Sequence, residues 1–181
     1  MDTVLDETVF RGRRLAIVGS ICRDVKIGAI RPGPHLLEDG ETPTELITET
    51  IGGGGANSAL AAAALGADVR FCGKVGADSL GQRLEQSLTH CGVKTFIRRD
   101  PQMATGSSVV LSYYHNGRLT VSPSIPVQQY KNTAGTGDLL SVCMMLLHGC
   151  DEIPPEDRLR LANTIVAEFI EGKRGVIPEL A

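Results

Sequence analysis

Short apolar runs that end at glycine alternate along this chain with longer segments whose apolar residues recur at helical spacing. The run 15–19 is apolar up to Gly19 and predicts a buried strand, and 69–75 and 93–97 predict further strands. Because strands and helices alternate, the pattern predicts an α/β layered fold. The helices are expected at 56–65, 79–90, 137–148 and 157–171.

Two stretches depart from this alternation and predict a lid of exposed strands. Residues 26–51 contain three prolines, three glycines and short alternating pieces such as 45–48. Later, two apolar pieces flank Asn116-Gly117, and Asn-Gly is a strong β-hairpin signal. The chain is therefore predicted to be one α/β domain over 1–181, with lid strands near 26–51 and 107–122.

Composition and charge exclude several classes of protein. The 181 residues are 42% apolar and 22% charged, which is ordinary for a globular chain and excludes wholesale disorder. A formal net charge of −3 gives no general attraction to nucleic acid or an anionic membrane. No apolar run approaches the roughly 18 residues that a membrane-spanning helix needs. Five cysteines without a Cys-x-x-Cys pair indicate reduced thiols in a cytoplasmic chain. We therefore expect no nucleic-acid or membrane partner.

The first candidate site is the glycine run that enters the helix predicted at 56–65. Gly53 and Gly54 would let a ligand approach the backbone, and Asn57 can hydrogen-bond a hydroxylated ligand. A plain turn with Asn57 as helix cap explains the same residues equally well. The run lacks the Gly-x-Gly-x-x-Gly spacing of dinucleotide-binding proteins and the Gly-Lys-Ser/Thr of a Walker A loop. A dinucleotide-binding oxidoreductase is accordingly the weakest hypothesis, although it shares the α/β pattern.

The second candidate site is the segment 132–138, which leads into an apolar helix. Gly135, Thr136 and Gly137 would point successive backbone N–H groups at one spot, with the positive end of the helix dipole behind them. Such an arrangement suits an oxyanion or a phosphate. Asp138 beside it could take a proton from an attacking hydroxyl. The alternative is an acidic residue that only favours the first helical turn, and this alternative leaves the Gly-Thr-Gly unexplained.

Asp24 is the third candidate, because it follows the strand predicted at 15–19. Ligands of open α/β sheets bind beyond the carboxyl ends of the strands. A carboxylate at this place could hold the hydroxyls of a sugar. The alternative is an acidic residue of a surface loop.

Together these motifs resemble those of the ribokinase-like, or pfkB, family of carbohydrate kinases. The first motif of that family is matched by 53–59, followed by Gly66 and Gly76 at the expected spacing. The opening 18–20 with Asp24 downstream also looks like the family's substrate side.

The second motif of the family is of the type Asp-Thr-x-Gly-Ala-Gly-Asp, and 132–138 matches it with two departures. Thr136 replaces the usual Ala, which keeps the backbone N–H group in place. Asn132 replaces the usual Asp near the monovalent-cation site of many members, and this departure weakens the expectation of a cation here.

The resemblance implies one sheet with helices on both faces, a small β lid, and ATP-dependent phosphorylation of a sugar or related hydroxylated substrate. It also implies Mg²⁺ that bridges the phosphates, with no metal-binding residue assigned, and a homodimer formed through the lid. By resemblance, Asp138 is the general base, Gly135, Thr136 and Gly137 hold the phosphoryl charge, Asp24, Gly53, Gly54 and Asn57 bind the sugar, and Asn163 lies near the nucleotide.

The middle of the chain departs from the family. Members carry several further βα units between the lid hairpin and the second motif, including much of the ATP pocket, whereas only 121–131 stands at that place here. The chain therefore resembles a pfkB kinase without its central segment, and we expect an incomplete sheet with exposed strand edges. A second hypothesis follows from this departure: a non-catalytic remnant that at most binds a sugar or a partner.

Overall fold

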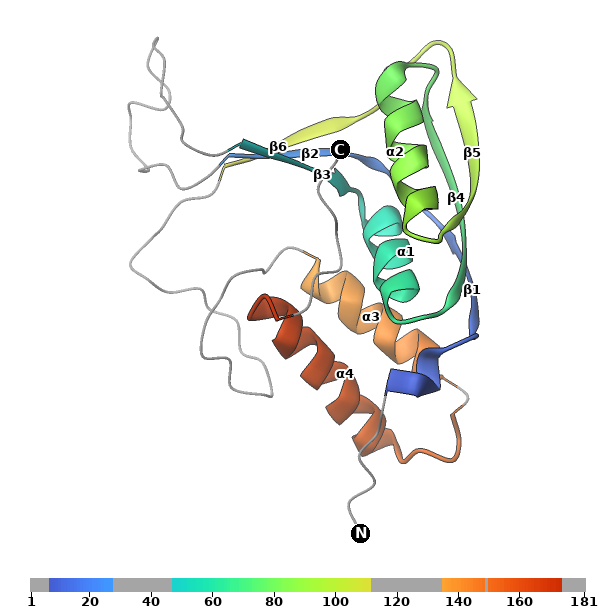
Figure 1. Ribbon diagram of the computed structural model, residues 1–181, viewed down its shortest axis with the longest axis vertical. Helices are drawn as coiled ribbons and strands as arrows, with labels where there is room; N and C mark the ends of the chain where they lie inside the picture. The colour runs from blue at the N-terminus through green and yellow to red at the C-terminus, as the bar shows by residue number, and fades with distance from the viewer. Residues whose placement is uncertain (1–6, 28–46, 112–134, 149, 174–181) are drawn as a thin grey trace.

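The computed structural model describes residues 7–27, 47–111, 135–148 and 150–173 of the 181-residue chain. In these ranges the chain forms two three-stranded sheets, with its helices packed on one side of the first sheet (Figure 1). The hairpin predicted around Asn116-Gly117 lies outside the described residues, as do most of the predicted lid positions between 26 and 51.

The first sheet has the strand order β1-β4-β5 and is parallel throughout. It consists of β1 (Arg14–Val18), β4 (Asp68–Gly76) and β5 (Lys94–Asp100). Ile17 of β1 pairs with Phe71 of β4, which in turn pairs with Thr95 of β5. Because the strands are parallel, their carboxyl ends lie at the same edge of the sheet, where β1 leads toward the lid strands.

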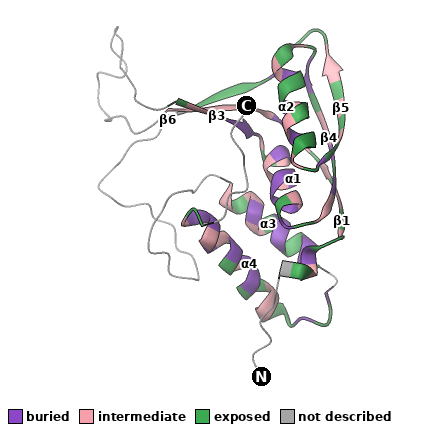
Figure 2. Cartoon of the chain, in the orientation of Figure 1, coloured by how far each residue is buried: buried purple, intermediate pink, exposed green. Residues whose placement is uncertain are grey.

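Helices cover one face of this sheet in successive layers. Helix α1 (Gly54–Ala64) packs on β1 and β4, and α2 (Ser79–His90) packs on β5. Helix α3 (Thr136–Leu147) packs against α1 and against α4 (Pro155–Ile170), and the short helix η1 (Glu7–Phe10) touches α3. Buried stretches of α1, α3 and α4 are purple in Figure 2. The fully buried core side chains include Phe71, Leu60, Leu84, Leu139 and Ile165.

The second sheet extends from the end of β1 and has the order β3-β2-β6. Strand β2 (Cys22–Ile27) pairs antiparallel with β3 (Ile47–Gly52) and parallel with β6 (Ser107–Leu111). Asp24 stands in the central strand of this sheet, between Thr50 and Ser108 in the register. We call this second sheet the lid sheet. Because β3 runs antiparallel to β2, the end of β3 and the glycine run that follows it lie directly beside the end of β1.

A hydrogen-bond network fixes the junction between the two sheets. The Asp78 carboxylate caps α2 by accepting from Gly81 N at 2.7 Å, and it also accepts from Thr105 N at 2.7 Å and Thr105 Oγ1 at 2.6 Å. The Thr105 hydroxyl accepts in turn from Gly76 N at 2.9 Å. These bonds from Thr105, followed by the bond from Gly81, lower the pKa of Asp78 to about 2. The end of β4, the start of α2 and the approach to β6 are thereby tied together.

The α/β fold and its four main helices are confirmed, but the prediction of a fully buried first strand is wrong. Strand β1 is only partly buried on its helix side, through Leu15 and Ile17, and Val18 at its end is 82% exposed. The physical reason is that, within the described residues, helices cover a single face of the β1-β4-β5 sheet. The expected sheet with helices on both faces is therefore incomplete in this part of the chain.

All five cysteines carry free thiols. Among the helices that the structure describes, none is long and apolar enough to cross a membrane.

Candidate active site

The glycine run begins α1 in close contact with the end of β1. A Cβ atom added to Gly55 would lie 2.7 Å from the Cα atom of Gly19, so neither backbone leaves room for a side chain. Gly53 has a φ of 92°, which favours glycine, and a Cβ there would lie 2.7 Å from the carbonyl oxygen of Ser20. Ala56 N donates to that same carbonyl oxygen at 3.1 Å. Gly53 and Gly55 therefore have a structural role: they seat α1 against the end of β1.

The second motif begins α3 in a similar way. Gly135 is the N-cap residue with a left-handed φ of 83°, and its carbonyl accepts the first helical hydrogen bond, from Leu139 N at 2.9 Å. No side chain caps α3, and none caps α1. The first-turn N–H groups of a helix have no partner within the helix and carry the positive end of its dipole. Both helix N-termini therefore present the positive end of a helix dipole to an anionic or hydroxylated ligand, although Ala56 N of α1 already donates to Ser20.

The packing of α1 on α3 brings the two motifs into contact. The Asp138 Oδ1 atom lies 3.5 Å from the position that a Cβ atom on Gly54 would occupy. Asp138 is partly buried in the first turn of α3, and Gly54 is the exposed first residue of α1. A carboxylate at the meeting point of two helix N-termini can accept a proton from a hydroxyl group held between them.

Asp24 approaches the same glycine run from the lid sheet. A Cβ atom added to Gly52 would overlap the Asp24 carboxylate, so that carboxylate lies directly over a residue without a side chain. Asp24 Oδ1 accepts hydrogen bonds from the Ser108 hydroxyl and from Cys22 Sγ, the latter at 3.6 Å. Burial, followed by the negative charge of Asp24, raises the pKa of the Cys22 thiol and keeps it protonated as a donor. Asp24 is thus a positioned acid of the lid sheet rather than an acid of a surface loop.

Two buried polar atoms near the glycine run have no hydrogen-bond partner among the described residues: Asn57 Oδ1 and Thr50 Oγ1. Buried polar groups are almost always paired, so each orphan needs an explanation, and a missing ligand is one. Asn57 lies in the first turns of α1, three residues after Gly54. Thr50 stands opposite Asp24 in the register of β2 and β3, and sequence reasoning missed it. The signal was present, because Thr48 and Thr50 alternate with apolar or ion-paired positions in β3.

Asn163, the predicted nucleotide-binding residue, is not brought to this contact by any described interaction. It is partly buried in the middle of α4, which packs on the side of α3, whereas Asp138 stands at the start of α3. Among the described residues, no group of three or more His, Cys, Asp or Glu side chains could hold a metal ion. The region between 112 and 134, including Asn132, is outside the described residues.

A surface hollow of about 520 Å³ lies elsewhere, between α2 and β5. Its lining includes Glu85, which is tied to Arg99 by an ion pair and accepts a hydrogen bond from Thr95 at 3.3 Å. None of the predicted site residues lines it.

Comparison with known proteins agrees with the first motif. Residues 13–124, more than half of the chain, match the model of the pfkB family carbohydrate kinases. Ribokinase from Haemophilus influenzae is 35% identical over 100 residues, which are 54% of this chain and 31% of that protein.

Two solved structures are similar over the same share of the chain. Ribokinase from Cryptococcus neoformans, in complex with ADP, is 31% identical with a TM-score of 0.44, and the match covers 57% of this chain and 31% of that one. Ribokinase from Arabidopsis thaliana, complexed with ribose and ATP, is 29% identical with a TM-score of 0.47, and the match covers 57% of this chain and 33% of that one.

The matched part of the chain thus spans about a third of the length of each of these relatives. The family match covers the glycine run and the lid strands and ends before the second motif. With more than half of its residues matched by the family model, the chain belongs to the pfkB family of carbohydrate kinases.

Proposed function

We propose that this chain takes part in the ATP-dependent phosphorylation of a sugar or related hydroxylated substrate, with Asp138 as the general base. The observation that carries the proposal is the contact between the two motifs, where Asp138 Oδ1 lies 3.5 Å from the Cβ position of Gly54. Neither motif alone makes a site. Their contact supplies a proton acceptor, two uncapped helix N-termini and a side-chain-free surface at one place.

Asp138 activates the substrate. A sugar hydroxyl is a weak nucleophile, and it gains reactivity when a carboxylate takes its proton as its oxygen attacks the terminal phosphorus of ATP. The bond from that phosphorus to ADP breaks, and the proton stays on Asp138. The acid must therefore face the bound sugar, and its place beside Gly54 supports this orientation.

The backbone of 135–137 holds the negative charge of the phosphoryl group during transfer. The left-handed conformation of Gly135 turns the chain into α3, so that the positive end of that helix faces the site. Charge that develops on the transferred oxygens is stabilised most by donors already in position, which need no reorganisation.

The sugar hydroxyls are held by Asp24 together with Gly53, Gly54 and Asn57. The hydrogen bonds from Ser108 and Cys22 position the Asp24 carboxylate, which can still accept further hydrogen bonds. The unpaired Asn57 Oδ1 is explained if it accepts a hydrogen bond from a substrate hydroxyl. Thr50, unpaired and opposite Asp24, joins this set as an additional candidate.

The described residues at this site could hold ATP and Mg²⁺ with few protein ligands. Mg²⁺ usually binds through substrate phosphates, water and one or two carboxylates, so a separate cluster of three protein ligands is not required. When bound, it neutralises the phosphate charge. Asp138 supplies one carboxylate at this place, in the first turn of α3 and beside Gly54 at the start of α1. Asn163 is assigned to the nucleotide side by the family resemblance alone.

A second candidate function is a non-catalytic remnant that at most binds a sugar or a partner. It is favoured by the first sheet, in which β1 has a neighbour on one side only among the described residues. In this candidate function Asp24 and Asn57 still bind the sugar, but Asp138 does not act as a general base.

The two candidates are separated by the release of ADP from ATP and Mg²⁺ with a panel of sugars, sugar acids and nucleosides. The variant Asp138→Asn removes the base, and Asp151→Asn, in an exposed turn before α4, is the matched control. We expect ADP release with one substrate class, which is lost in Asp138→Asn and kept in the control. A folded protein that binds a sugar from the panel but releases no ADP would support the remnant instead.

A further inference from the structure

One face of the parallel sheet is uncovered within the described residues. Helices α1 and α2 pack on the face that carries Phe71 and Val75, and the opposite face carries the alternate residues of each strand. Sheets made only of parallel strands are almost always covered on both faces. The uncovered face, which we call the bare face, consists of positions 14, 16 and 18 of β1, 68, 70, 72 and 74 of β4, and 94, 96, 98 and 100 of β5.

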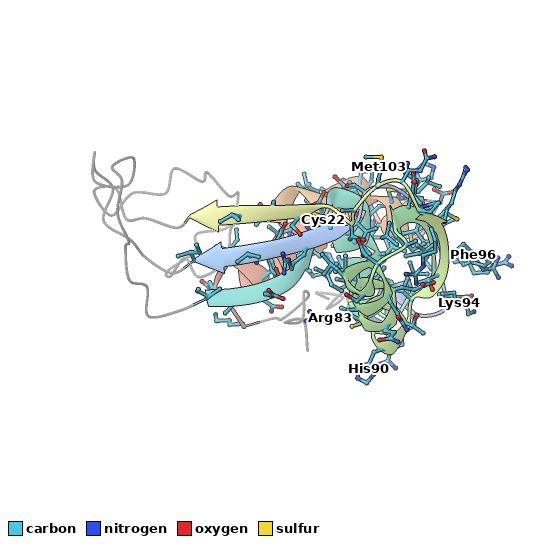
Figure 3. The ribbon with its side chains drawn as sticks, turned by 90° about the horizontal axis from the view of Figure 1, so that it is seen from above. Cys22, Arg83, His90, Lys94, Phe96 and Met103 are labelled. Carbon is cyan, nitrogen blue, oxygen red and sulfur yellow. The ribbon has the colours of Figure 1, made fainter. Side chains whose placement is uncertain are left out.

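An apolar row crosses the bare face from one edge of the sheet to the other. Val18 pairs with Cys72, and Cys72 pairs with Phe96, so the three side chains stand next to one another on adjacent strands. Val18 is 82% exposed and Phe96 is 59% exposed, although both are large apolar residues in regular strands. Figure 3 shows Phe96 and Lys94 projecting from β5 away from the helices. When a partner covers an apolar row of this kind and removes it from water, the free energy of the system falls.

Basic side chains flank the apolar row on both sides. Arg14, Arg70 and Lys94 lie toward the start of the strands, and Lys74 and Arg98 lie toward their end. Two acids share the face: Asp68 pairs with Lys94 at 2.8 Å and Asp100 pairs with Lys74 at 3.1 Å. Five basic and two acidic side chains make the bare face positive, in a chain whose formal net charge is −3.

The ionisation of the two acids reflects this positive surface. The hydrogen bond from Lys94, supported by the charges of Lys94, Arg70 and Arg14, lowers the pKa of Asp68. The hydrogen bond from Gln102 N, followed by that from Lys74, lowers the pKa of Asp100. Both acids are already engaged, whereas Arg14, Arg70 and Arg98 make no ion pair with any described residue.

We propose that the bare face docks an amphipathic α-helix of another polypeptide, with its apolar stripe on Val18, Cys72 and Phe96 and acidic residues on both flanks. The outer strands of a three-stranded sheet are about 10 Å apart, which is about the diameter of one α-helix with its side chains. The chemistry of the partner follows from the charge of the face, because complementary charges steer and orient association. A second copy of this chain docked face to face would instead place basic residues against basic residues.

Two synthetic helical peptides test the proposal. One carries a leucine stripe flanked by glutamates, and the other has lysines in place of the glutamates. Binding of each peptide to the chain is measured by fluorescence anisotropy without nucleotide or sugar, so the result is independent of kinase activity. We expect the glutamate peptide to bind at least about tenfold more tightly than the lysine peptide, and to bind more weakly as salt is raised.

Variants locate the binding on the bare face. Phe96→Ser removes the centre of the apolar row, and the double variant Arg70→Glu, Arg98→Glu reverses the charge of both flanks. Each is expected to weaken binding of the glutamate peptide about tenfold or more, since apolar and arginine anchors dominate such interfaces. The matched control is Arg11→Glu, Arg160→Glu, which reverses two exposed charges off this face and is expected to leave binding within about twofold. Thermal unfolding of every variant verifies that it is folded.

Three results would overturn the proposal. The first is equal binding of the two peptides, or no binding of either. The second is glutamate-peptide binding that the bare-face variants leave unchanged. The third is a different occupant: concentration-dependent self-association that Phe96→Ser abolishes, or single-stranded DNA that binds more tightly than the glutamate peptide.

Discussion

The carboxylate of Asp138 lies against the backbone of Gly54, with Oδ1 3.5 Å from the point where a Cβ atom of Gly54 would stand. The two residues come from motifs far apart in the sequence, and the packing of α1 on α3 brings them together. Both helices begin on a glycine with positive φ and without a side-chain cap. The contact therefore combines a proton acceptor with two helix N-termini, and this combination supports the proposed kinase chemistry.

Gly55→Ala is expected to destabilise the fold. The new Cβ atom would stand 2.7 Å from the Cα atom of Gly19, and a backbone contact of this kind cannot be relieved by rotating a side chain. We expect the free energy of unfolding to fall by roughly 1–3 kcal/mol, measured by urea denaturation.

The matched control for that prediction is Gly54→Ala, one residue earlier in the same helical turn. Its Cβ atom would meet only Asp138 Oδ1, at an ordinary contact distance of 3.5 Å. Stability should stay within about 1 kcal/mol or rise slightly, because alanine favours a helix over glycine. Equal losses in the two variants would refute the assignment of Gly55 to the contact between β1 and α1.

Gly52→Ala is expected to impair sugar binding more than stability. The new methyl group would take the place of the Asp24 carboxylate, which can rotate away but then loses its bonds to Ser108 and Cys22. We expect the KM for the sugar to rise about tenfold while kcat changes less than about threefold. Gly106→Ala, immediately before β6 of the lid sheet, is the control, since its Cβ atom would meet only Cys22 Cβ at 3.5 Å. An unchanged KM in Gly52→Ala would remove Asp24 from the sugar site.

Asn57→Leu is expected to separate function from stability. Asn57 Oδ1 is buried without a partner among the described residues, so replacing the amide by an apolar group of similar size removes an unsatisfied acceptor. The melting temperature should be unchanged or higher, whereas calorimetric titration should show sugar binding at least about tenfold weaker. A clear loss of stability would mean that Asn57 serves as a structural residue of α1.

The Asp78 carboxylate makes the stability of the fold depend on pH in the acid range. Hydrogen bonds lower the pKa of Asp78 from an ordinary 3.8 to about 2 in the folded chain. Because the folded pKa is the lower one, the stabilisation is complete above the ordinary value and is lost as the pH falls from about 4 toward 2.

The variant Asp78→Asn tests this dependence, with Asp151→Asn as the control in an exposed turn. Melting temperatures are compared between pH 6 and pH 2. Asp78→Asn should lower the melting temperature at pH 6 and reduce the difference between the variant and the wild type at pH 2. A constant difference over this range would contradict the assigned role of the Asp78 carboxylate.

The helices were predictable from the sequence because their signals are local. The segment 79–90 carries leucines at helical spacing, and the structure gives α2 the same bounds, with Gly92 at a φ of 84° just beyond it. The α/β pattern and the glycine-led starts of α1 and α3 were predictable in the same way.

The tertiary features could not be predicted from local sequence patterns. An apolar run such as 15–19 predicts a strand buried on both faces, yet the exposure of Val18 depends on which helices reach the second face. The overlap of Gly52 with Asp24 and the orphan hydroxyl of Thr50 depend on the register between β2 and β3. The proximity of Gly54 and Asp138 was implied only by the resemblance to the family, since no local pattern links the two motifs.

The rate of ADP formation reports directly on whether Asp138 activates a substrate hydroxyl. The measurement compares kcat and KM of the wild type and Asp138→Asn with the best sugar of the panel, at saturating ATP and Mg²⁺. We expect kcat to fall by about 10²–10⁴-fold, as for other general bases, with KM within about threefold. A loss of less than about tenfold in kcat in a folded variant would contradict this role of Asp138.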